Sequence, residues 1–489
     1  MLRAYAVADV REVEDAAMAV LPEGELMARA ARGLADVVRE RLQQRRGSRV
    51  VALVGAGNNG GDALYAVSLL AREGVHCAAL TSAAPAHPGG LRAALDAGVP
   101  VVEADQDWPG VLAVADLVVD GITGIGGSAG LRPQARAWAD AIPERAYVVA
   151  VDLPSGTDPA GLVATADAVF ADETVTFGEP KPVHLLPAGE SAVGRLTVVD
   201  IGLDFAGRTP VVERLTPADV PSLWPVPGPM DDKYSRGVVG SVTGSTAYPG
   251  AAILSVLGAL GTGPGMVRYL GPRSVAELVH YHAPESVAAL GRVQAWVLGS
   301  GIDTDDTQAE DQVSRVVDAL FDDVPVLVDA GGLDVVAPRR APMVLTPHAG
   351  ELARLLTRLH LAPTGATEVS RTDVVAAPLA HARLAADHFG CVVLLKGSTT
   401  LVVPPTDSAR PVRSQADAPA WLATAGAGDV LGGVIGTLLA SGLHPVDAAS
   451  LGALVHGQAA HRANPGGPVR AFELARGIPA TVAALLGAH

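Results

Sequence analysis

The sequence predicts a two-domain α/β protein. Its 489 residues exceed the length that one hydrophobic core usually serves. Both halves repeat one unit, in which a short β-branched strand is followed by a glycine-containing turn and a helix with apolar residues at helical spacing. Between the halves lies a proline-rich segment, 204–229, without a long periodic apolar run. We therefore expect one domain at 1–206 and a second at 207–489.

Composition excludes several protein classes. Hydrophobic residues make up 49% of the chain, yet it has no uninterrupted apolar run of about 18 residues, so no membrane span is expected. The charged start, 1–17, lacks the apolar core of a signal peptide. A net charge of −16 disfavours nucleic acid as the main partner. Cys77 and Cys391 are far apart and indicate a reducing compartment. We expect a soluble cytoplasmic enzyme.

The first half opens with two helices and a strand–loop–helix unit. Residues 9–41 have helical spacing that is interrupted at 21–24, so the second helix is expected to start near Glu23. The β-branched run 49–54 predicts a buried parallel strand. It leads through the glycine-rich loop 55–62 into the next helix.

The loop 55–62 satisfies the pattern G-x-G-x-x-G of dinucleotide-binding folds. That fingerprint also requires an acidic residue at the end of the second strand, where it holds the ribose. The second strand here, 75–80, is followed by Thr-Ser, so a standard NAD-binding unit is disfavoured. The loop instead carries Asn58, Asn59 and Asp62, which can bind a ligand or a cation, although Asn and Gly can also serve only a turn.

Two later strands end in carboxylates. One ends at Asp120 and another at Asp152, three residues before Ser155. The carboxyl ends of strands in a doubly wound sheet face one crevice, so we expect these side chains and that of Asn59 to converge there. Oxygen ligands without Cys or His suit a hard cation rather than zinc. An aspartate after a strand is often only a helix cap, but three positions on one edge favour a site.

Five ordered motifs resemble those of the NAD(P)H-hydrate epimerase domain. They are GAGNNGGD (55–62), VVDGITGIG (118–126), VDLPSG (151–156), KPVHLLPAG (181–189) and VDIGL (199–203). The resemblance runs from about Tyr5 to Leu203. It implies a Rossmann-like three-layer fold and the interconversion of the R and S forms of hydrated nicotinamide cofactors.

The epimerase resemblance also implies roles for individual residues. It implies a potassium ion held by Asn59, Asp120 and Ser155, and it makes Asp152 the catalytic acid/base. The implied substrate-binding residues are Asn58, Asn59, Gly60, Gly61, Asp62, Gly124, Gly126 and Gly130. The sequence departs from the family pattern at Ala63, where glycine is usual, and at Ile125, where threonine is usual. The second departure weakens the expected phosphate contact of that loop.

Strands of the second half also end in residues that can carry chemistry. Strand 324–329 ends in an aspartate, and strand 391–395 runs into Lys396, which would suit a nucleotide phosphate. The sequence TPHAGE places His348 in a loop, where histidines are well placed to contact ligands. Residues 248–252 open a helix of small residues through Leu260, which permit either close helix packing or the approach of a flat ligand.

The stretch LATAGAGDVLGG (422–433) carries the strongest chemical signal. Gly426 and Gly428 bracket a tight turn, Asp429 follows at once, and an apolar helix is expected over 430–440. Backbone N–H groups at a helix N-terminus bind anions, and a glycine turn lets phosphate oxygens approach the backbone. A phosphoryl group and a base-capable aspartate can therefore share one corner. An ordinary glycine loop capped by Asp is the alternative.

Four motifs of the second half resemble the ADP- or ATP-dependent NAD(P)H-hydrate dehydratase, a member of the ribokinase-like fold. They are DKYSRGVVGSVTGS (232–245), LTPHAGEL (345–352), LLKGSTT (394–400) and LATAGAGDVLGG. The match covers roughly 215–486. It implies that the substrate hydroxyl is phosphorylated and then eliminated, with Asp429 as base and magnesium on the phosphates. ADP is the expected co-substrate, with ATP as the alternative.

The dehydratase resemblance implies two further sets of contacts. The implied contacts to the hydrated nicotinamide are Ala251, Ala252, Gly301 and His348. The implied nucleotide-binding residues are Lys396, Gly397, Ser398, Thr399, Thr400, Gly426 and Gly428. The segment 414–420, which precedes LATAGAGDVLGG, lacks the Asn-Pro-Gly character of the family. We therefore do not assign to it the ligand contacts that the family makes there.

These observations predict a fused repair enzyme, in which the first domain epimerises NADHX and NADPHX and the second dehydrates the S epimer. We expect a homo-oligomer that binds neither nucleic acid nor membrane. The alternative is a C-terminal small-molecule kinase with a non-catalytic N-terminal nucleotide-binding or scaffold domain.

Overall fold

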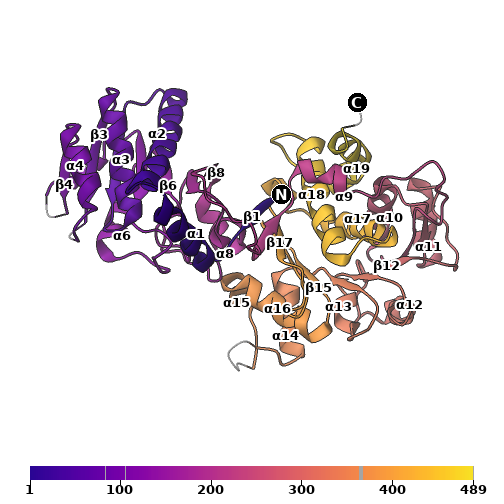
Figure 1. Cartoon of the computed structure of the whole chain (residues 1–489). Coiled ribbons are helices and arrows are strands. Elements are labelled where there is room, and N and C mark those ends of the chain that lie inside the picture. Colours follow the sequence, from indigo (N-terminus) through magenta and orange to yellow (C-terminus); the bar gives the residue numbers. More distant parts are fainter. Residues whose placement is uncertain (83, 105, 363–366, 488–489) are drawn as a thin grey trace. The chain divides into compact units, whose positions relative to one another are not determined.

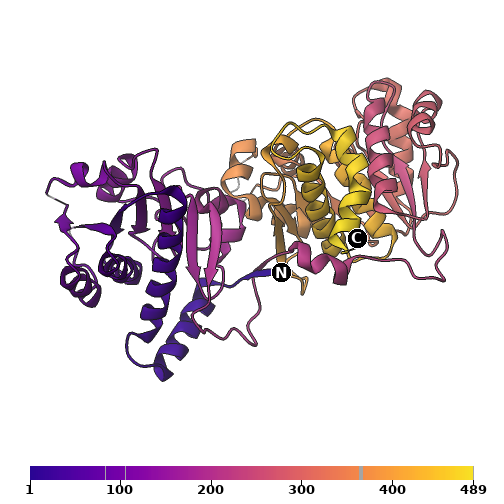
Figure 2. The same ribbon diagram turned by 90° about the horizontal axis from the view of Figure 1, so that it is seen from above.

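The computed structural model describes residues 1–82, 84–104, 106–362 and 367–487. The chain forms two compact units, one of residues Arg3–Val212 and one of Met1–Leu2 with Glu213–His489 (Figures 1 and 2). Both units are α/β, which confirms the predicted fold class.

The first unit contains a seven-stranded parallel sheet with the strand order β4-β3-β2-β5-β6-β7-β8. The chain therefore moves outward from β2 on both sides, and the crevice between β2 and β5 is the usual ligand position of such a sheet. The strands are β2 (Arg49–Val54), β3 (His76–Thr81), β4 (Val101–Glu103), β5 (Leu117–Gly121), β6 (Tyr147–Val151), β7 (Glu173–Phe177) and β8 (Arg195–Val199).

Helices cover both faces of this sheet and make three layers. Alternate residues of β2 point to opposite faces: Val50 packs with α2 and α3, whereas Val51 packs in a separate cluster with Trp138 of α6. The helices are α1 (Val7–Val20), α2 (Glu25–Arg45), α3 (Asn58–Arg72), α4 (Pro88–Asp96), α5 (Trp108–Leu112), α6 (Pro133–Asp140), α7 (Pro182–Leu185) and α8 (Pro187–Val193).

The second unit is built on a ten-stranded sheet with the order β1-β9-β17-β16-β15-β14-β13-β12-β10-β11. The strands from β11 to β15 are parallel, and β16 runs antiparallel to both of its neighbours. The strands are β1 (Leu2–Ala4), β9 (Val212–Arg214), β10 (Val238–Val242), β11 (Met266–Tyr269), β12 (Ala295–Leu298), β13 (Val326–Val328), β14 (Met343–Leu345), β15 (Val392–Leu395), β16 (Thr400–Val403) and β17 (Val412–Gln415).

Helices α10, α17, α18 and α19 pack together, and Figure 1 shows them on one side of this sheet. A side chain at Gly433 of α17 would clash with the backbone of α10, so the small residues of these helices serve close packing. The helices are α9 (Val220–Leu223), α10 (Pro249–Thr262), α11 (Arg273–His282), α12 (Glu310–Leu320), α13 (Gly332–Val335), α14 (Ala349–Arg358), α15 (Arg371–Ala376), α16 (Pro378–Phe389), α17 (Ala427–Ala440), α18 (Pro445–Ala463), α19 (Ala471–Leu485) and the short 3-10 helices at Pro217–Asp219, Thr307–Ala309 and Ala420–Leu422.

One predicted helix boundary was wrong. Helix α17 starts at Ala427 and not at residue 430, so Asp429 lies inside its first turn. The reason is that Gly426 adopts φ +87° and caps the helix, which can then begin with the next residue.

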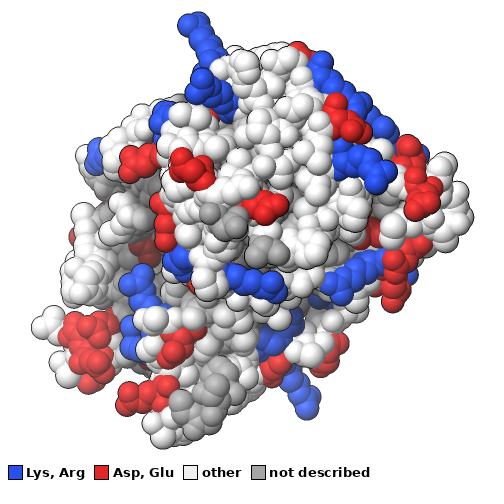
Figure 3. Space-filling model, turned by 90° about the vertical axis from the view of Figure 1, so that its left-hand side faces the viewer, with Lys and Arg blue, Asp and Glu red and all other residues white. Residues whose placement is uncertain are grey.

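The surface shows mixed charge. On the face drawn in Figure 3, Lys and Arg side chains are interspersed with Asp and Glu side chains. In the part of the chain that the structure describes, no helix combines the length and apolar character that crossing a membrane requires.

Candidate active sites

In the first unit, the three predicted potassium ligands lie in one hydrogen-bond network. Asp120 is fully buried and accepts hydrogen bonds from the backbone N–H of Ser155 (2.8 Å) and from its hydroxyl (2.6 Å). The Ser155 Oγ also accepts from the N–H of Thr123 at 2.9 Å. The amide nitrogen of Asn59 donates to the carbonyl oxygens of Thr123 (3.3 Å) and Val151 (2.6 Å).

This network is suited to a monovalent cation. Burial raises the pKa of Asp120, and the hydrogen bonds from Ser155 only partly oppose this. Among the described residues, no cluster of three or more His, Cys, Asp or Glu could hold a metal, so the available donors are one carboxylate and neutral oxygens. One buried negative charge among neutral oxygens matches a singly charged hard cation in both charge and ligand type.

Asp152 lies directly after β6 and is held by a buried lysine. Its Oδ1 is 2.6 Å from the Nζ of Lys181, which is fully buried, and it accepts a hydrogen bond from the Thr176 hydroxyl at 3.0 Å. Burial by itself would raise the pKa of Asp152, but the charge and hydrogen bond of Lys181 outweigh it, and the pKa is lowered. Asp152 is therefore ionised at neutral pH.

The backbone of Asp152 is also fixed. Its φ of +64° is rare for a residue other than glycine and is tolerated only where the surroundings hold it. Nε2 of His184 donates to the Asp152 carbonyl oxygen at 2.8 Å, while Nδ1 of the same ring accepts the Lys181 N–H at 3.0 Å. Burial lowers the pKa of His184 to about 4, so this ring is neutral.

Two further carboxyl groups lie close to Asp152. Asp62 is 93% buried, and its Oδ1 has no hydrogen-bond partner among the described residues. Burial, followed by the charges of Asp152 and Glu14, raises the pKa of Asp62 well above its usual value. Burial raises the pKa of Glu14 as well, and Lys181 opposes this. The negative charge of Asp152 therefore favours the neutral form of the buried Asp62.

The predicted glycines border the same crevice. Asn58, Gly60 and Gly61 lie in the first turn of α3. The loop after β5 carries Gly124, Gly126 and Gly130. A side chain at Gly124 would collide with the Asn59 amide, and the Gly130 N–H donates to the Gly156 carbonyl oxygen at 2.8 Å.

The second unit brings together residues from three strand ends and α17. The Nζ of Lys396, which follows β15, lies 2.6 Å from Oδ1 of Asp329 and 3.7 Å from Oε2 of Glu351. Asp329 follows β13 and also accepts hydrogen bonds from the hydroxyls of Ser300 (3.1 Å) and Thr346 (2.9 Å). Gly428 of α17 faces this pair, because a side chain there would begin 3.6 Å from the lysine Nζ.

Two aspartates beside one lysine have different pKa values. Burial and the negative charge of Asp329 raise the pKa of Asp429 to about 6, while the charge of Lys396 opposes this. Burial alone would raise the pKa of Asp329 too, but Lys396 lowers it overall. Asp329 is therefore the permanent counter-charge of the lysine, and Asp429 is a carboxyl that changes charge near neutral pH.

His348 caps helix α14. Its Nδ1 accepts the backbone N–H groups of Gly350 (3.0 Å) and Glu351 (3.2 Å), which leaves the proton on Nε2. The Glu351 carboxylate accepts the N–H of His348 at 2.7 Å in return. The side chain of His348 is half exposed, and its Nε2 lies 3.6 Å from Oε1 of Glu351.

One predicted contact of the second unit, Gly301, lines a cavity. This cavity of about 290 Å³ is lined by residues that include Tyr248, Gly301, Glu351 and Arg354. Gly301 has φ +69° and lies against Ala251, whereas Ala252 is fully buried. In the predicted nucleotide-binding segment, Gly397 and Ser398 are exposed, Thr399 is buried, and Thr400 begins β16.

The sequence did not assign several residues of these sites. Lys181 and His184 lie in the motif KPVHLLPAG, and Asp329 ends a predicted strand, so a signal was present for each. No sequence signal pointed to Glu14. Only the fold brings Glu14 of α1 near enough to Asp152 for the two charges to influence each other.

Two family models match separate parts of the chain. A family model described as NAD(P)H-hydrate dehydratase matches residues 239–475, and one described as the YjeF-related protein N-terminus matches residues 23–183. A crystal structure of the ADP/ATP-dependent NAD(P)H-hydrate dehydratase from Bacillus subtilis, co-crystallised with ATP/Mg²⁺, is similar at 27% identity and a TM-score of 0.49; the match covers 56% of this chain and 99% of that chain.

Curated relatives match over nearly the full length. The bifunctional NAD(P)H-hydrate repair enzyme Nnr of Mycobacterium tuberculosis is 45% identical over 91% of both chains, and that of Mycobacterium leprae is 43% identical over 98% of this chain and 99% of the relative. The NAD(P)H-hydrate epimerase of Clavibacter sepedonicus is 42% identical over 42% of this chain and 93% of its own length. Because identity is this high over both halves, the chain belongs to the bifunctional NAD(P)H-hydrate repair enzymes, which join an epimerase to a dehydratase.

Proposed function

We propose that Asp152, held by Lys181, is the proton-transferring group of the epimerase step. Water that adds to the enamine of a reduced nicotinamide leaves a hydroxyl on the carbon next to the ring nitrogen. The ionised Asp152 accepts the hydroxyl proton while the carbon–nitrogen bond breaks, its electron pair moves to the nitrogen, and an aldehyde forms. Closure of the ring on the opposite face returns the proton and gives the other epimer. The observation that carries this proposal is the buried, ionised Asp152, which lies 2.6 Å from the Nζ of Lys181 and whose charge raises the pKa of the buried Asp62.

A potassium ion would be held by Asn59, Asp120 and Ser155. The support is the buried Asp120 carboxylate, which has hydrogen bonds but no cationic partner among the described residues. When bound, the ion supplies positive charge at the crevice. The chain's own contribution is to hold the loops after β5 and β6 together through Thr123 and Ser155.

For the dehydratase step, we propose that Asp429 accepts the substrate hydroxyl proton as a phosphoryl group arrives from ADP or ATP. The first-turn N–H groups of α17 and the ammonium of Lys396 would stabilise the phosphoryl charge. Elimination of the resulting phosphate ester then restores the reduced cofactor. Magnesium would supply countercharge to the phosphates, while Asp329 stays paired with Lys396.

The remaining contacts follow the family resemblance. Gly397, Ser398, Thr399 and Thr400 would contact the nucleotide. Ala251, Gly301 and His348 would contact the hydrated nicotinamide, with the 290 Å³ cavity as its position. The domain limits 1–206 and 207–489, a homo-oligomeric state and a cytoplasmic location stay predictions. The two buried free thiols of Cys77 and Cys391 support the last of these.

The test is incubation of the full chain with mixed NADHX epimers and either ADP or ATP. We expect both epimers to be consumed and NADH to form, with an Asp152→Asn variant consuming only the S form. A stable phosphorylated product without NADH would instead support the small-molecule kinase alternative.

A further inference from the structure

A buried histidine that the mechanism above does not use contacts the first turn of α17. His456 lies in α18 and is 94% buried. Its Nε2 is 2.8 Å from the carbonyl oxygen of Ala427, the first residue of α17. Since a carbonyl oxygen only accepts hydrogen bonds, Nε2 carries the proton. Burial lowers the pKa of His456 to about 4, so the ring is neutral and donates this bond throughout the physiological pH range.

The hydrogen bond acts on the peptide group that faces the proposed phosphoryl site. The carbonyl of Ala427 and the N–H of Gly428 belong to one planar peptide unit and point in opposite directions. A donor on that carbonyl therefore fixes the direction of the Gly428 N–H, which has no acceptor within its own helix. It also polarises the peptide, because consecutive hydrogen bonds strengthen one another. Gly428 is the residue that faces Lys396.

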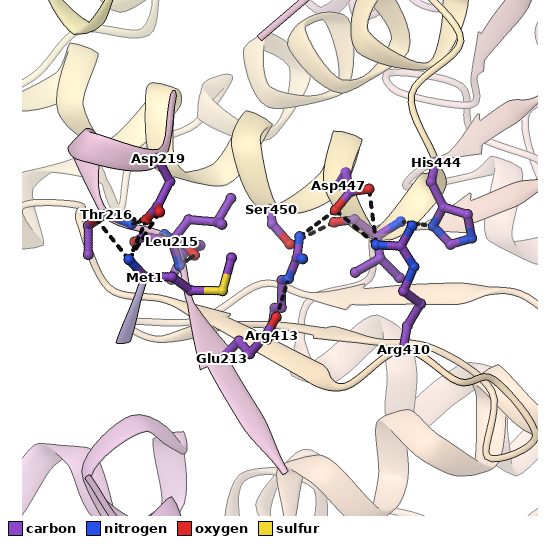
Figure 4. A network of polar contacts seen from close by, with 12 residues as sticks. Met1, Glu213, Leu215, Thr216, Asp219, Arg410, Arg413, His444, Asp447 and Ser450 are labelled. Atoms are coloured by element: carbon purple, nitrogen blue, oxygen red, sulfur yellow. Dashed lines mark hydrogen bonds and ion pairs between the residues drawn. The ribbon is translucent and has the colours of Figure 1, made fainter. Parts of the chain in front are cut away.

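Helix α18 is a rigid support for this contact. Asp447, in its first turn, pairs with the buried guanidinium of Arg413 at 2.6 Å, and Arg413 pairs in turn with Glu213 at 3.2 Å (Figure 4). Next to His456, a side chain at Gly457 would begin 2.8 Å from the carbonyl carbon of Asp417. The residue that follows the histidine is therefore closely packed against the neighbouring backbone.

We propose that His456 is a positioning residue of the dehydratase, which aligns and polarises the Ala427–Gly428 peptide so that the Gly428 N–H donates to the transferring phosphoryl group. This inference rests on the proposed role of α17. It assigns to α18 a part in catalysis without contact to substrate.

The experiment compares three variants of the full chain by steady-state dehydration kinetics. In His456→Leu, which removes the donor, kcat falls about tenfold while KM for the hydrated cofactor stays nearly constant, because the lost interaction stabilises charge only in the transition state. His456→Gln places an amide N–H near the position of Nε2 and restores most of kcat. Since His456 is neutral, the acid limb of the pH profile of kcat is the same in His456→Leu as in the unchanged protein.

His381→Leu is the matched control. His381 of α16 is also buried in the second unit, and its Nδ1 is 2.8 Å from the carbonyl oxygen of Ala377, the N-cap of that helix. Its removal carries the cost of losing a buried histidine but leaves α17 untouched, so kcat is retained. If His456→Leu does not fold, His456→Asn replaces it, because the shorter amide does not reach Ala427.

Two outcomes overturn the proposal: an unchanged kcat in His456→Leu, or an equal loss of kcat in His381→Leu. The proposed function is tested separately by Asp429→Asn. If that variant still dehydrates the substrate, the proposed role of Asp429 is wrong, whatever the result for His456. Epimerisation by the first unit of the same molecules reports that the protein is intact.

Discussion

The two candidate catalytic aspartates differ in how the protein sets their charge. Asp152 is paired with a buried lysine, and its pKa is lowered. Asp429 lies in the first turn of a helix beside a second carboxylate, and its pKa is raised to about 6. In each unit the pKa of a second carboxyl is shifted the other way: that of Asp62 is raised and that of Asp329 is lowered. Each site therefore contains two carboxyl groups whose pKa values are separated by their environment.

The two sites also share a structural feature. A buried neutral histidine donates a 2.8 Å hydrogen bond from Nε2 to a backbone carbonyl at each site, His184 to Asp152 and His456 to Ala427. In the first unit this bond helps to hold a φ of +64°, a strain of about 1–3 kcal/mol that surrounding contacts must offset. In the second unit the backbone is ordinary helix, and the bond directs an N–H group instead.

The largest expected effect is a loss of dehydration without a loss of epimerisation. Asp429→Asn keeps the shape of the side chain but cannot accept the substrate proton, so dehydration falls by roughly 10²–10⁴-fold. Epimerisation continues, since Asp152 lies in the other compact unit. The measurement is NADH formation and epimer ratio in one reaction. Loss of both activities would contradict the assignment of one aspartate to each site.

Lys181→Met tests the ion pair that distinguishes Asp152. It leaves a buried carboxylate without its partner, which costs about 3–5 kcal/mol in the stability of the first unit and abolishes epimerisation. Chemical unfolding and epimer analysis measure the two effects. In the double variant Lys181→Met with Asp152→Asn, most of the stability returns without activity. If Lys181→Met alone left the stability of the first unit unchanged, the ion pair of Lys181 and Asp152 would not be needed to stabilise the buried carboxylate.

Gly124→Ala tests the cation site. The added side chain collides with the Asn59 amide, so the potassium concentration for half-maximal epimerisation rises by about 10–100-fold, and excess potassium restores activity. Gly57→Ala is the control, because Gly57 has an ordinary φ of −91° and open space around its Cα. Equal effects of the two variants, or no rescue by potassium, would argue against the site.

The smallest effect is a difference in pH dependence. Dehydration requires ionised Asp429, so its kcat/KM falls about tenfold per pH unit below pH about 6. Epimerisation persists to lower pH, because the pKa of Asp152 is lowered and its ionised form survives. Asp329→Asn removes a charge that raises the pKa of Asp429, and shifts the dehydration limb to lower pH. Coincident profiles for the two activities would contradict this contrast.

The sequence by itself determined the α/β class, the family and most elements. The run Arg49–Val54 is a strand with the predicted limits, since a buried parallel strand reads as an uninterrupted β-branched stretch. The motifs at strand ends and glycine turns predicted where both candidate sites lie, because the residues of each motif are close together in sequence. Roles for Asp152 and Asp429 came from family resemblance and stay predictions until they are tested.

Only the tertiary structure decided the charge states and supports of these residues. Lys181 is 29 residues from Asp152, Lys396 is 67 from Asp329, and His456 is 29 from Ala427. A pKa depends on burial and on charges a few ångströms away, and neither can be read from spacing along the chain. The start of α17 at Ala427 likewise followed from the left-handed backbone of Gly426, which the glycine permitted but did not require.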